Sequence, residues 1–430
     1  MPARQRPDVA RMPVTSSPKD LEPDSEEPPG PREAREASDA RRVSARAGSA
    51  RRTLTQTRAA DARLETIEIA APDPTFLPDV VVEPRPRVRR LPRRITDLSA
   101  VEVVVLYSLA LGLERGRPED LLADEETAQV AQRVAEALEG EVGAVHLAPV
   151  WDDVAGAMRA YDPRRSVVFN LVESLGGRGF SEAEVPRLLR SMGYIHTGGT
   201  YQALRRSGNK LVAKRILESN GLRTPRYQVF HRRSERVLTV PLPAIAKPVA
   251  EGGSFGVTQA SVARTEEQLF AQVDSILRTY HQPALVEEFI VGREINVALW
   301  GNGQPEVLPI SEIIFDWTDD PLRKLVTFEA KWVEESAEYQ HTPGICPAHL
   351  TPEEKSRIED AAVRTYQLLG VKGFARVDMR LRDGEPYILE VNVNPDLAPD
   401  AGFFRSARAA GHTYPSMVLA ILKMALASRP

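Results

Sequence analysis

From about residue 98 to the C-terminus, the chain alternates between short apolar runs and segments that repeat an apolar position every three to four residues. The runs are typical of strands covered on both faces, and the repeats of amphipathic helices. In the first part of this region the patterns predict strands over 101–111, 142–147 and 167–172, and helices over 127–138, 154–161 and 184–192. We therefore expect an open α/β domain there, built on a largely parallel sheet.

After residue 200 the elements no longer alternate regularly. The pattern predicts one long helix over 201–220 that ends at Gly221, followed by strands over 227–230, 244–248 and 284–290. A third unit begins near Glu294. The expected fold class is thus α/β and α+β, with four parts: a tail over 1–97, an N-terminal α/β substrate domain over 98–199, a central subdomain over 200–292 and a C-terminal subdomain over 293–430.

Residues 1–97 are rich in Pro, Arg, Ala, Ser and Glu, contain one aromatic residue (Phe76) and show no sustained periodicity. Such a segment buries too little apolar surface to offset its ordering entropy, so we expect it to be disordered. Residues 85–94 hold six arginines and no acid. This run is open to two interpretations, an anionic docking tag or a solvated linker.

Composition restricts the setting of the protein. A net charge of −4 over 430 residues gives no general attraction to nucleic acid or membranes. The single cysteine, Cys346, excludes an intrachain disulfide and fits a reducing compartment. No apolar run approaches the roughly 18 residues of a membrane span, and residues 1–40 lack the apolar core of a secretory signal. We therefore expect a cytoplasmic protein without nucleic-acid or membrane partners.

The strongest chemical signal is a predicted hairpin over 374–395, with Asp383-Gly384 at its turn. Its otherwise apolar strands carry four polar residues: Arg376, Asp378, Glu390 and Asn392. A two-residue turn would place Asp378 and Glu390 on opposite faces, whereas a three-residue turn would set them directly across from each other, about 5 Å apart. Two carboxylates that close need a cation between them, and a set of oxygen ligands suits Mg²⁺. The alternative is a solvated hairpin with scattered charges.

Three further groups point to a nucleotide. Lys247 ends a predicted strand and precedes a glycine-rich loop, residues 251–256, whose backbone amides could approach a phosphate. Glu287 with the following backbone could face an adenine edge, and Glu294 could accept bonds from ribose hydroxyls. Lys210 is a second lysine able to reach phosphate. Each is an ordinary surface residue when taken singly; their order along the chain favours a shared site.

Together these segments resemble the ATP-grasp fold, and within it the D-alanine–D-alanine ligases and their relatives. The resemblance covers about residues 100–430 and rests on Gly198-Gly199 through Asn209-Lys210, on Lys247-Pro248 with Glu251-Gly252-Gly253-Ser254, on 286–294, on Lys331-Trp332 and on the hairpin. It implies ATP between the central and C-terminal parts, and two Mg²⁺ ions, replaceable by Mn²⁺, on Asp378, Glu390 and Asn392. It implies nucleotide contacts from Lys210, Lys247, Glu251, Gly252, Gly253, Ser254, Glu287, Phe289, Ile290, Glu294 and Lys331, and catalytic roles for Arg376, Lys331 and Lys247.

The chain departs from the family where substrates bind. Where the family usually has a tyrosine, this chain has Trp332, and where the family has Asn-Pro-Gly, it has Asn394-Pro395-Asp396. The family's serine that holds the second substrate's carboxylate is replaced by Ala401. Glu173 follows a predicted strand at the edge where open α/β sheets bind ligands, so it could hold an ammonium group; helix capping or solvation explains it equally well. Arg405 or Arg408, in a helix after Gly402, could hold a carboxylate instead of the missing serine. We expect Glu173, Arg376, Asp396, Gly402 and Arg405 to contact substrates.

Three functions remain in competition. The leading hypothesis is a carboxylate–amine ligase that uses ATP and an acyl phosphate to join amino acids or short peptides. The second is an authentic D-alanine–D-alanine ligase of cell-wall peptidoglycan synthesis. The third is a nucleotide-binding regulatory or scaffold protein, which loss of a metal carboxylate would have favoured. The sequence leaves open the identity of the substrates and whether the protein forms a homodimer.

Overall fold

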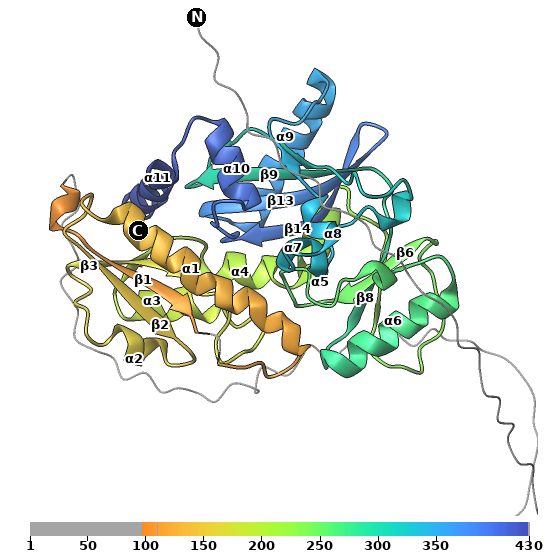
Figure 1. Cartoon of the computed structure of the whole chain (residues 1–430), viewed down its shortest axis with the longest axis horizontal. Coiled ribbons are helices and arrows are strands. Elements are labelled where there is room, and N and C mark those ends of the chain that lie inside the picture. Colours follow the sequence, from red (N-terminus) through yellow and green to blue (C-terminus); the bar gives the residue numbers. More distant parts are fainter. Residues whose placement is uncertain (1–96, 110, 429–430) are drawn as a thin grey trace, which may run out of the picture. The chain divides into compact units, whose positions relative to one another are not determined.

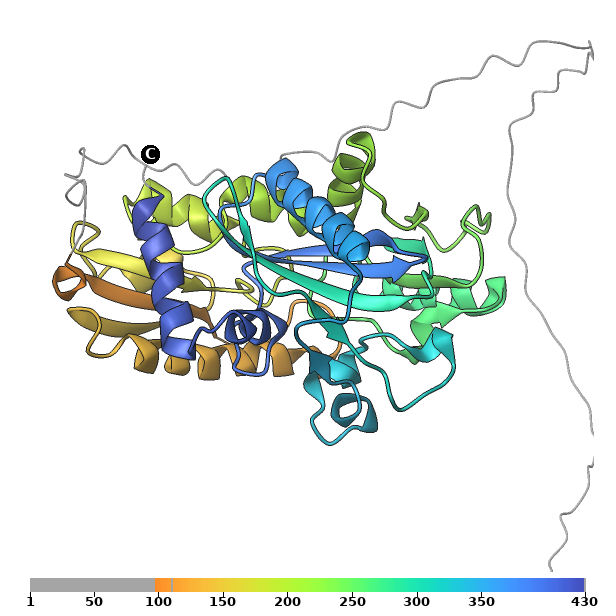
Figure 2. The same ribbon diagram turned by 90° about the horizontal axis from the view of Figure 1, so that it is seen from above.

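The structure, a computed structural model, describes residues 97–109 and 111–428. The predicted disordered tail and its arginine run therefore lie outside the described residues, apart from Asp97. Within them, three sheets and their helices form the fold (Figures 1 and 2). No helix in the described ranges is long and apolar enough to cross a membrane.

The first sheet is parallel, in the order β2 (Ala144–Val150), β1 (Glu102–Ser108), β3 (Ser166–Leu171), β4 (Ile195–His196). One face packs on α1 (Leu121–Leu138) and on the C-terminal helix α11 (Tyr414–Ala427); the other packs on α2 (Val154–Met158) and α3 (Glu184–Ser191). Val103 and Val105 enter the first core while Val104 and Leu106 enter the second, which explains the unbroken apolar run of β1. The predicted parallel α/β unit is confirmed. Strand β1 is shorter than the predicted strand 101–111, whereas β2 and β3 differ from the predicted strands only by small shifts of their ends.

The central sheet of the C-terminal half is antiparallel. Its order is β12 (Gly344–Ile345), β11 (Ser311–Ile313), β9 (Arg293–Gly301), β13 (Gly373–Arg382), β14 (Glu385–Val393), with β10 (Glu306–Val307) also paired to β9. Helix α9 (Pro352–Leu369) covers one face, as Figure 2 shows. It begins at a capping box of Thr351 and Glu354 and ends at Gly370, which has a left-handed φ of 71°. Apolar residues of β13 face this helix, which leaves the other face of the strand to polar residues.

The third sheet is also antiparallel, in the order β5 (Tyr227–Phe230), β8 (Ala284–Glu288), β6 (Ala244–Pro248), β7 (Val262–Ala263). Helix α6 (Glu266–Thr279) packs on it through Leu269, Val273 and Ile276. The short helices α7 (Phe328–Trp332) and α8 (Ala337–Gln340) lie between β11 and α9 in the chain, and α10 (Gly402–Ala409) follows β14.

The prediction of one helix over 201–220 is wrong. The chain forms α4 (Tyr201–Ser207) and α5 (Lys210–Ser219), which are separated at Gly208 and Asn209. The Asn209 side chain accepts hydrogen bonds from the backbone nitrogens of Leu211 and Val212, at 3.1 and 3.2 Å, and so starts a second helix. Both helices pack on the core of the six-stranded sheet, although their residues fall in the predicted central subdomain. The division into domains stays a prediction.

Candidate active site

The hairpin of β13 and β14 aligns its polar residues through a β-bulge. Asp383 and Gly384 form a two-residue turn with φ of 54° and 73°, and Arg382 pairs with Glu385. The register then shifts by one beside Met379, which leaves Leu389 as an extra residue in β14. Asp378 therefore lies directly across from Glu390. The expectation that a two-residue turn separates these carboxylates is wrong, because the bulge restores the pairing that a three-residue turn would have given.

The neighbouring strands extend this polar face. Asp378 pairs with Asn296 of β9, and Asn296 pairs in turn with Ser311 of β11. Residues in register on adjacent strands share a face. One row of polar side chains therefore crosses four strands, with members Ser311, Asn296, Asp378 and Glu390. Along β13 the next polar positions are two residues away on either side, Arg376 and Arg380.

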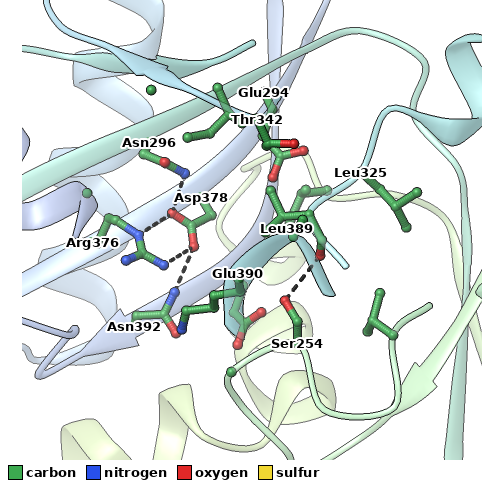
Figure 3. Close-up of a pocket in the computed structure, with 18 of the residues that line it drawn as sticks. Ser254, Glu294, Asn296, Leu325, Thr342, Arg376, Asp378, Leu389, Glu390 and Asn392 are labelled. Carbon is green, nitrogen blue, oxygen red and sulfur yellow. Dashed lines mark hydrogen bonds and ion pairs between the residues drawn. The ribbon is translucent and has the colours of Figure 1, made fainter. Parts of the chain in front are cut away.

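Asp378 is the centre of the hydrogen bonds on this face (Figure 3). It accepts from Arg376 Nε at 2.7 Å and Nη2 at 2.9 Å, and from the amide nitrogens of Asn296 and Asn392, both at 2.8 Å. Burial alone would lower the pKa of the Arg376 guanidinium, but the charge of Asp378, with those of Asp396 and Glu390, outweighs burial and raises it. Arg376 is thus a permanent cation fixed at the centre of the face. Sequence analysis missed Asn296. It could have been noticed as the one amide side chain in the mostly apolar segment 293–301.

The candidate metal ligands lie on this same face. Asp378, Glu390 and Asn392 offer carboxylate and amide oxygens, which suit a hard cation such as Mg²⁺. Asn392 turns its amide nitrogen toward Asp378, so its oxygen would face a cation there only after the amide turned over. Glu390 Oε1 is 3.6 Å from Lys210 Nζ, which offsets part of the repulsion between the paired carboxylates. The described residues contain no group of three or more His, Cys, Asp or Glu side chains placed to hold a metal.

Glu287 is held by two lysines. It is 1 % exposed and forms ion pairs with Lys247 and with Lys214, which comes from α5. Burial would raise the pKa of the Glu287 carboxyl, but the two lysines outweigh it and lower the pKa, so the group stays ionised. Lys247 and Glu287, expected to face phosphate and adenine separately, thus contact each other. Lys214 was missed, although it follows Lys210 by one helical turn.

A cavity of about 430 Å³ opens between the β-hairpin face, the glycine-rich loop and α7. Its lining includes apolar side chains, among them Ile245, Phe289, Ile290, Leu325 and Val326. It also includes most of the predicted site residues: Lys247, Gly253, Ser254, Glu287, Glu294, Lys331, Arg376, Asp378, Glu390, Asn392, Asp396, Gly402 and Arg405. Glu294 forms an ion pair with Arg380 at 2.7 Å. Such a mixed lining suits a ligand with both apolar and charged groups.

The glycine-rich loop is fastened to the segment around α7. Ser254, with a left-handed φ of 62°, donates its hydroxyl to the Val326 carbonyl at 3.1 Å. Trp332 Nε1 donates to the Gly253 carbonyl at 2.7 Å, and Lys331 Nζ lies 4.4 Å from the Trp332 ring centroid. The tryptophan thus connects the two segments through its indole nitrogen, and it holds Lys331 at the cavity wall.

Arg405 occupies the wall near Gly402. Its Nε donates to Ser311 Oγ at 2.9 Å, which places it at the end of the polar row. Burial, and then the charge of Arg376, lower the pKa of Arg405, because two guanidinium groups share one part of the cavity. Such a pair favours an anion between them. Arg408, the alternative candidate, is exposed.

A second cavity, of about 180 Å³, meets the first at Lys331, Trp332, Arg376 and Asp396. Three predicted residues line this cavity but not the first: Glu173, Glu251 and Gly252. Lys210 donates to the carbonyl of Glu251, and the Glu251 side chain accepts from Gln282 Nε2 at 2.6 Å. All predicted site residues except Lys210 therefore line one or both of two connected cavities, and Arg376 and Asp396 lie where these meet.

Comparison with known proteins identifies the family. The family described as D-ala D-ala ligase C-terminus matches residues 216–423. An uncharacterized protein y4sG of Sinorhizobium fredii is 35 % identical over 260 residues, 60 % of this chain and 74 % of that protein. The D-alanine–D-alanine ligase of Desulforudis audaxviator is 34 % identical over 254 residues, 57 % of this chain and 77 % of the ligase.

A solved structure agrees in fold. The D-alanine–D-alanine ligase of Bacillus anthracis, complexed with ATP, superposes with a TM-score of 0.58 at 21 % identity, over 76 % of this chain and 98 % of that protein. The resemblance inferred from sequence is thereby confirmed. The chain belongs to the D-alanine–D-alanine ligase family of the ATP-grasp fold, which makes it an ATP-dependent ligase that forms C–N bonds.

Proposed function

We propose that the protein joins the carboxylate of one amino acid or short peptide to the amine of another, with ATP as the energy source and an acyl phosphate as the intermediate. One observation carries the proposal. The cation Arg376 and the carboxylate Glu390 lie where two cavities meet, and Asp378, which pairs with each of them, lines the larger cavity. A phosphoryl donor in one cavity and an acceptor in the other would come together at that point.

We infer that ATP occupies the larger cavity. Its adenine would pack on Phe289 and Ile290, with the ribose near Glu294. Lys247 and the amides of residues 252–254 would contact the phosphates, and Lys331 would approach the γ-phosphate from α7. Lys210 would support the loop through the Glu251 carbonyl.

Asp378, Glu390 and Asn392 would hold Mg²⁺, or Mn²⁺ in its place, because their oxygens line one face beside the inferred phosphate position. Bound Mg²⁺ would supply neutralisation of the charge on the β- and γ-phosphates. Two ions is the number that the family resemblance implies.

The reaction has two steps. A carboxylate oxygen of the first substrate attacks the γ-phosphorus, the bond to the β,γ-bridging oxygen breaks, and ADP leaves. The amine nitrogen of the second substrate then attacks the carbonyl carbon of the acyl phosphate, inorganic phosphate departs, and the nitrogen loses a proton. Arg376 would stabilise the negative charge that develops on the transferred phosphoryl group and on the tetrahedral intermediate.

The second substrate's carboxylate would bind between Arg376 and Arg405. Ala401 offers no hydroxyl there, and Gly402 leaves room: a Cβ at Gly402 would lie 3.2 Å from Arg405 Nη2 and 3.5 Å from Arg376 Cδ. An amine substrate that keeps its carboxylate but is bulkier than alanine would suit this wall. Asp396 would contact the substrates where the two cavities meet, and Glu173 would contact them in the smaller cavity.

An authentic D-alanine–D-alanine ligase is the second candidate, and the names of the similar proteins favour it. The change at Ala401 argues against it. A scaffold role has no support beyond the sequence-based alternative, because both carboxylates and Arg376 are present and paired.

The experiment is a product screen. Purified protein is incubated with ATP, Mg²⁺ and pools of L- and D-amino acids and dipeptides, and products are identified by mass spectrometry alongside phosphate release. The proposal expects a new amide product with one ADP formed for each bond. ADP formation without any joined product across all pools would contradict it, and D-alanyl-D-alanine as the best product would favour the second candidate.

A further inference from the structure

The smaller cavity continues well past the reacting centre. From Arg376 and Asp396 it extends to a pole lined by Arg115, Asp120 and Glu182. These residues belong to the N-terminal α/β unit, and none of them lines the larger cavity. A simple α-amino acid would fill the end of the smaller cavity near Arg376 and would leave the pole empty.

Glu182 places one unpartnered carboxylate oxygen at this pole. The residue as a whole is half-buried, but its Oε2 atom is fully buried and has no hydrogen-bond partner among the described residues. Burial, with a smaller contribution from the charge of Glu251, outweighs a hydrogen bond from the backbone amide of Glu182 and raises the pKa of the Glu182 carboxyl to about 7. A buried carboxylate oxygen without a partner is costly for the fold, so it suggests a ligand group that completes it.

The other acids of the pole have their partners. Asp120 accepts hydrogen bonds from Tyr280 Oη at 3.1 Å and from the Arg117 backbone nitrogen at 2.8 Å. Glu251 accepts from Gln282 and lies 3.3 Å from Arg115 Nε. Among the described residues Arg115 pairs with Glu251, although its Nε makes no hydrogen bond, and Glu182 has no ion pair.

The loop before Glu182 is held in a constrained conformation that shapes the cavity. Phe180 has a left-handed φ of 65°, which a bulky side chain adopts only at a cost of order 1 kcal/mol or more. Its ring packs on Gly208, where any Cβ would lie 2.1 Å from a ring carbon. Gly179 leaves no space for a side chain either, because a Cβ there would lie 2.2 Å from Glu251 Oε2. These contacts fix Phe180 and Glu182 on the cavity wall rather than leaving them to solvent.

We infer that the substrate whose carboxylate is activated carries an ammonium group at its far end, and that Glu182 binds this group. The substrate would lie along the smaller cavity, with its carboxylate at Arg376 and its ammonium at Glu182. Short peptides, through the N-terminal amine, and diamino acids, through the side chain, share this chemistry. The inference rests on the proposed function, because it takes the reacting carboxylate to lie at Arg376.

Binding is measured first, without turnover. The full-length protein, saturated with Mg²⁺ and a non-hydrolysable ATP analogue, is titrated calorimetrically with Ala-Ala dipeptides and lysine of both configurations. N-acetylated Ala-Ala and Nε-acetyl-lysine are the matched probes that lack the remote ammonium. We expect one ammonium probe to bind at least tenfold more tightly than its acetylated partner. If that probe is the dipeptide, the substrate is a short peptide; if it is lysine, the substrate is a diamino acid. Glu182→Gln should remove the difference, whereas Glu184→Gln, whose side chain pairs with Arg187 on the surface, should keep it.

Turnover then separates this inference from the proposed function. Each probe is given alone with ATP and hydroxylamine, which traps an acyl phosphate as a hydroxamate and so identifies the activated substrate. Glu182→Gln should raise the KM of that substrate at least tenfold and leave the KM of ATP unchanged.

Three outcomes would change this picture. If alanine gives the most hydroxamate, and its KM is the same in wild type and Glu182→Gln, the inference is overturned and the ligase proposal stands. Glu182-dependent binding without any hydroxamate would support the inference at the binding level and count against the ligase proposal. No preference for any ammonium probe would overturn the inference outright.

Discussion

At the scale of single residues, the two arginines of α10 provide a matched pair. Arg405 lines the larger cavity beside Arg376, whereas Arg408 is exposed on the same helix. Arg405→Ala should raise the KM of the amine substrate by about 10- to 100-fold, because a charge-assisted hydrogen bond contributes roughly 1.5–3 kcal/mol. Steady-state kinetics of the two substrates and ATP measure the effect. Arg408→Ala is the control and should leave all three KM values unchanged; equal effects of both variants would show that Arg405 acts only through general charge.

Glu182 also leads to a prediction about pH and stability. Its pKa of about 7 in the folded protein exceeds the ordinary value of 4.5, so the folded state binds more protons than the unfolded state between these values. The free energy of unfolding should therefore fall as pH rises through this window, by an amount of order 1–3 kcal/mol. Glu182→Gln should remove that loss. Thermal unfolding should show a higher Tm for the variant than for wild type at pH 8 and nearly equal values at pH 4.5; a Tm difference of the same size at both pH values would contradict the assignment.

Sequence analysis identified the residues that carry charge better than it identified their partners. Arg376, Asp378, Glu390 and Asn392 were singled out together because they are the polar positions in the apolar strands of one predicted hairpin, and the bulge brings Asp378 and Glu390 to one face. Lys214 and Asn296 were missed, because each comes from a distant segment and meets Glu287 or Asp378 only after folding. Local periodicity indicates which face a residue occupies, but not which residue lies across from it.

At the scale of elements, irregular features set the geometry of the site. The bulge at Leu389 and the break between α4 and α5 were both absent from the prediction. A bulge adds one residue without changing the composition of a strand, and the break depends on Asn209 capping the next helix. Regular elements such as 227–230 and 244–248 were predicted with the bounds that the structure has.

The contact between α7 and the glycine-rich loop can be tested by a substitution that removes its hydrogen-bond donor, Trp332 Nε1. Trp332→Phe removes the hydrogen bond from Nε1 to the Gly253 carbonyl while keeping an aromatic ring beside Lys331. A lost hydrogen bond of about 1 kcal/mol should raise the KM of ATP by about two- to tenfold. Trp317→Phe is the control, because Trp317 Nε1 has no hydrogen-bond partner among the described residues. An unchanged KM in Trp332→Phe would show that the indole does not help to hold the loop.

At the scale of the whole molecule, the family and the fold were predictable because their motifs are spread along the chain in a fixed order. The packing of the C-terminal helix α11 on α1 was not, since apolar faces are interchangeable when only the sequence is known. The parts of the chain that meet in the first core are nearly three hundred residues apart, and nothing local to either specifies the other.

The N-terminal tail leads to a prediction that rests on its composition alone. Deletion of residues 1–95 should change Tm by no more than about 2 °C and leave ATP turnover unchanged, because the segment offers little apolar surface to bury. Differential scanning fluorimetry and ADP release, compared between the full chain and the truncated protein, measure both quantities. A large drop in Tm would show that the tail packs on the rest of the protein.

The face around Asp378 is the part of the molecule that would activate a carboxylate. The most direct measurement is the rate of hydroxamate formation from ATP, Mg²⁺, hydroxylamine and the acyl donor in wild type, Asp378→Asn and Asp383→Asn. Asp378→Asn should lower the rate at least a hundredfold in protein that is still folded at the assay temperature, because it removes the charge that pairs with Arg376 and would hold the metal. Asp383→Asn should match wild type, since Asp383 is exposed and asparagine suits its left-handed turn position. Wild-type hydroxamate formation by Asp378→Asn would contradict the account.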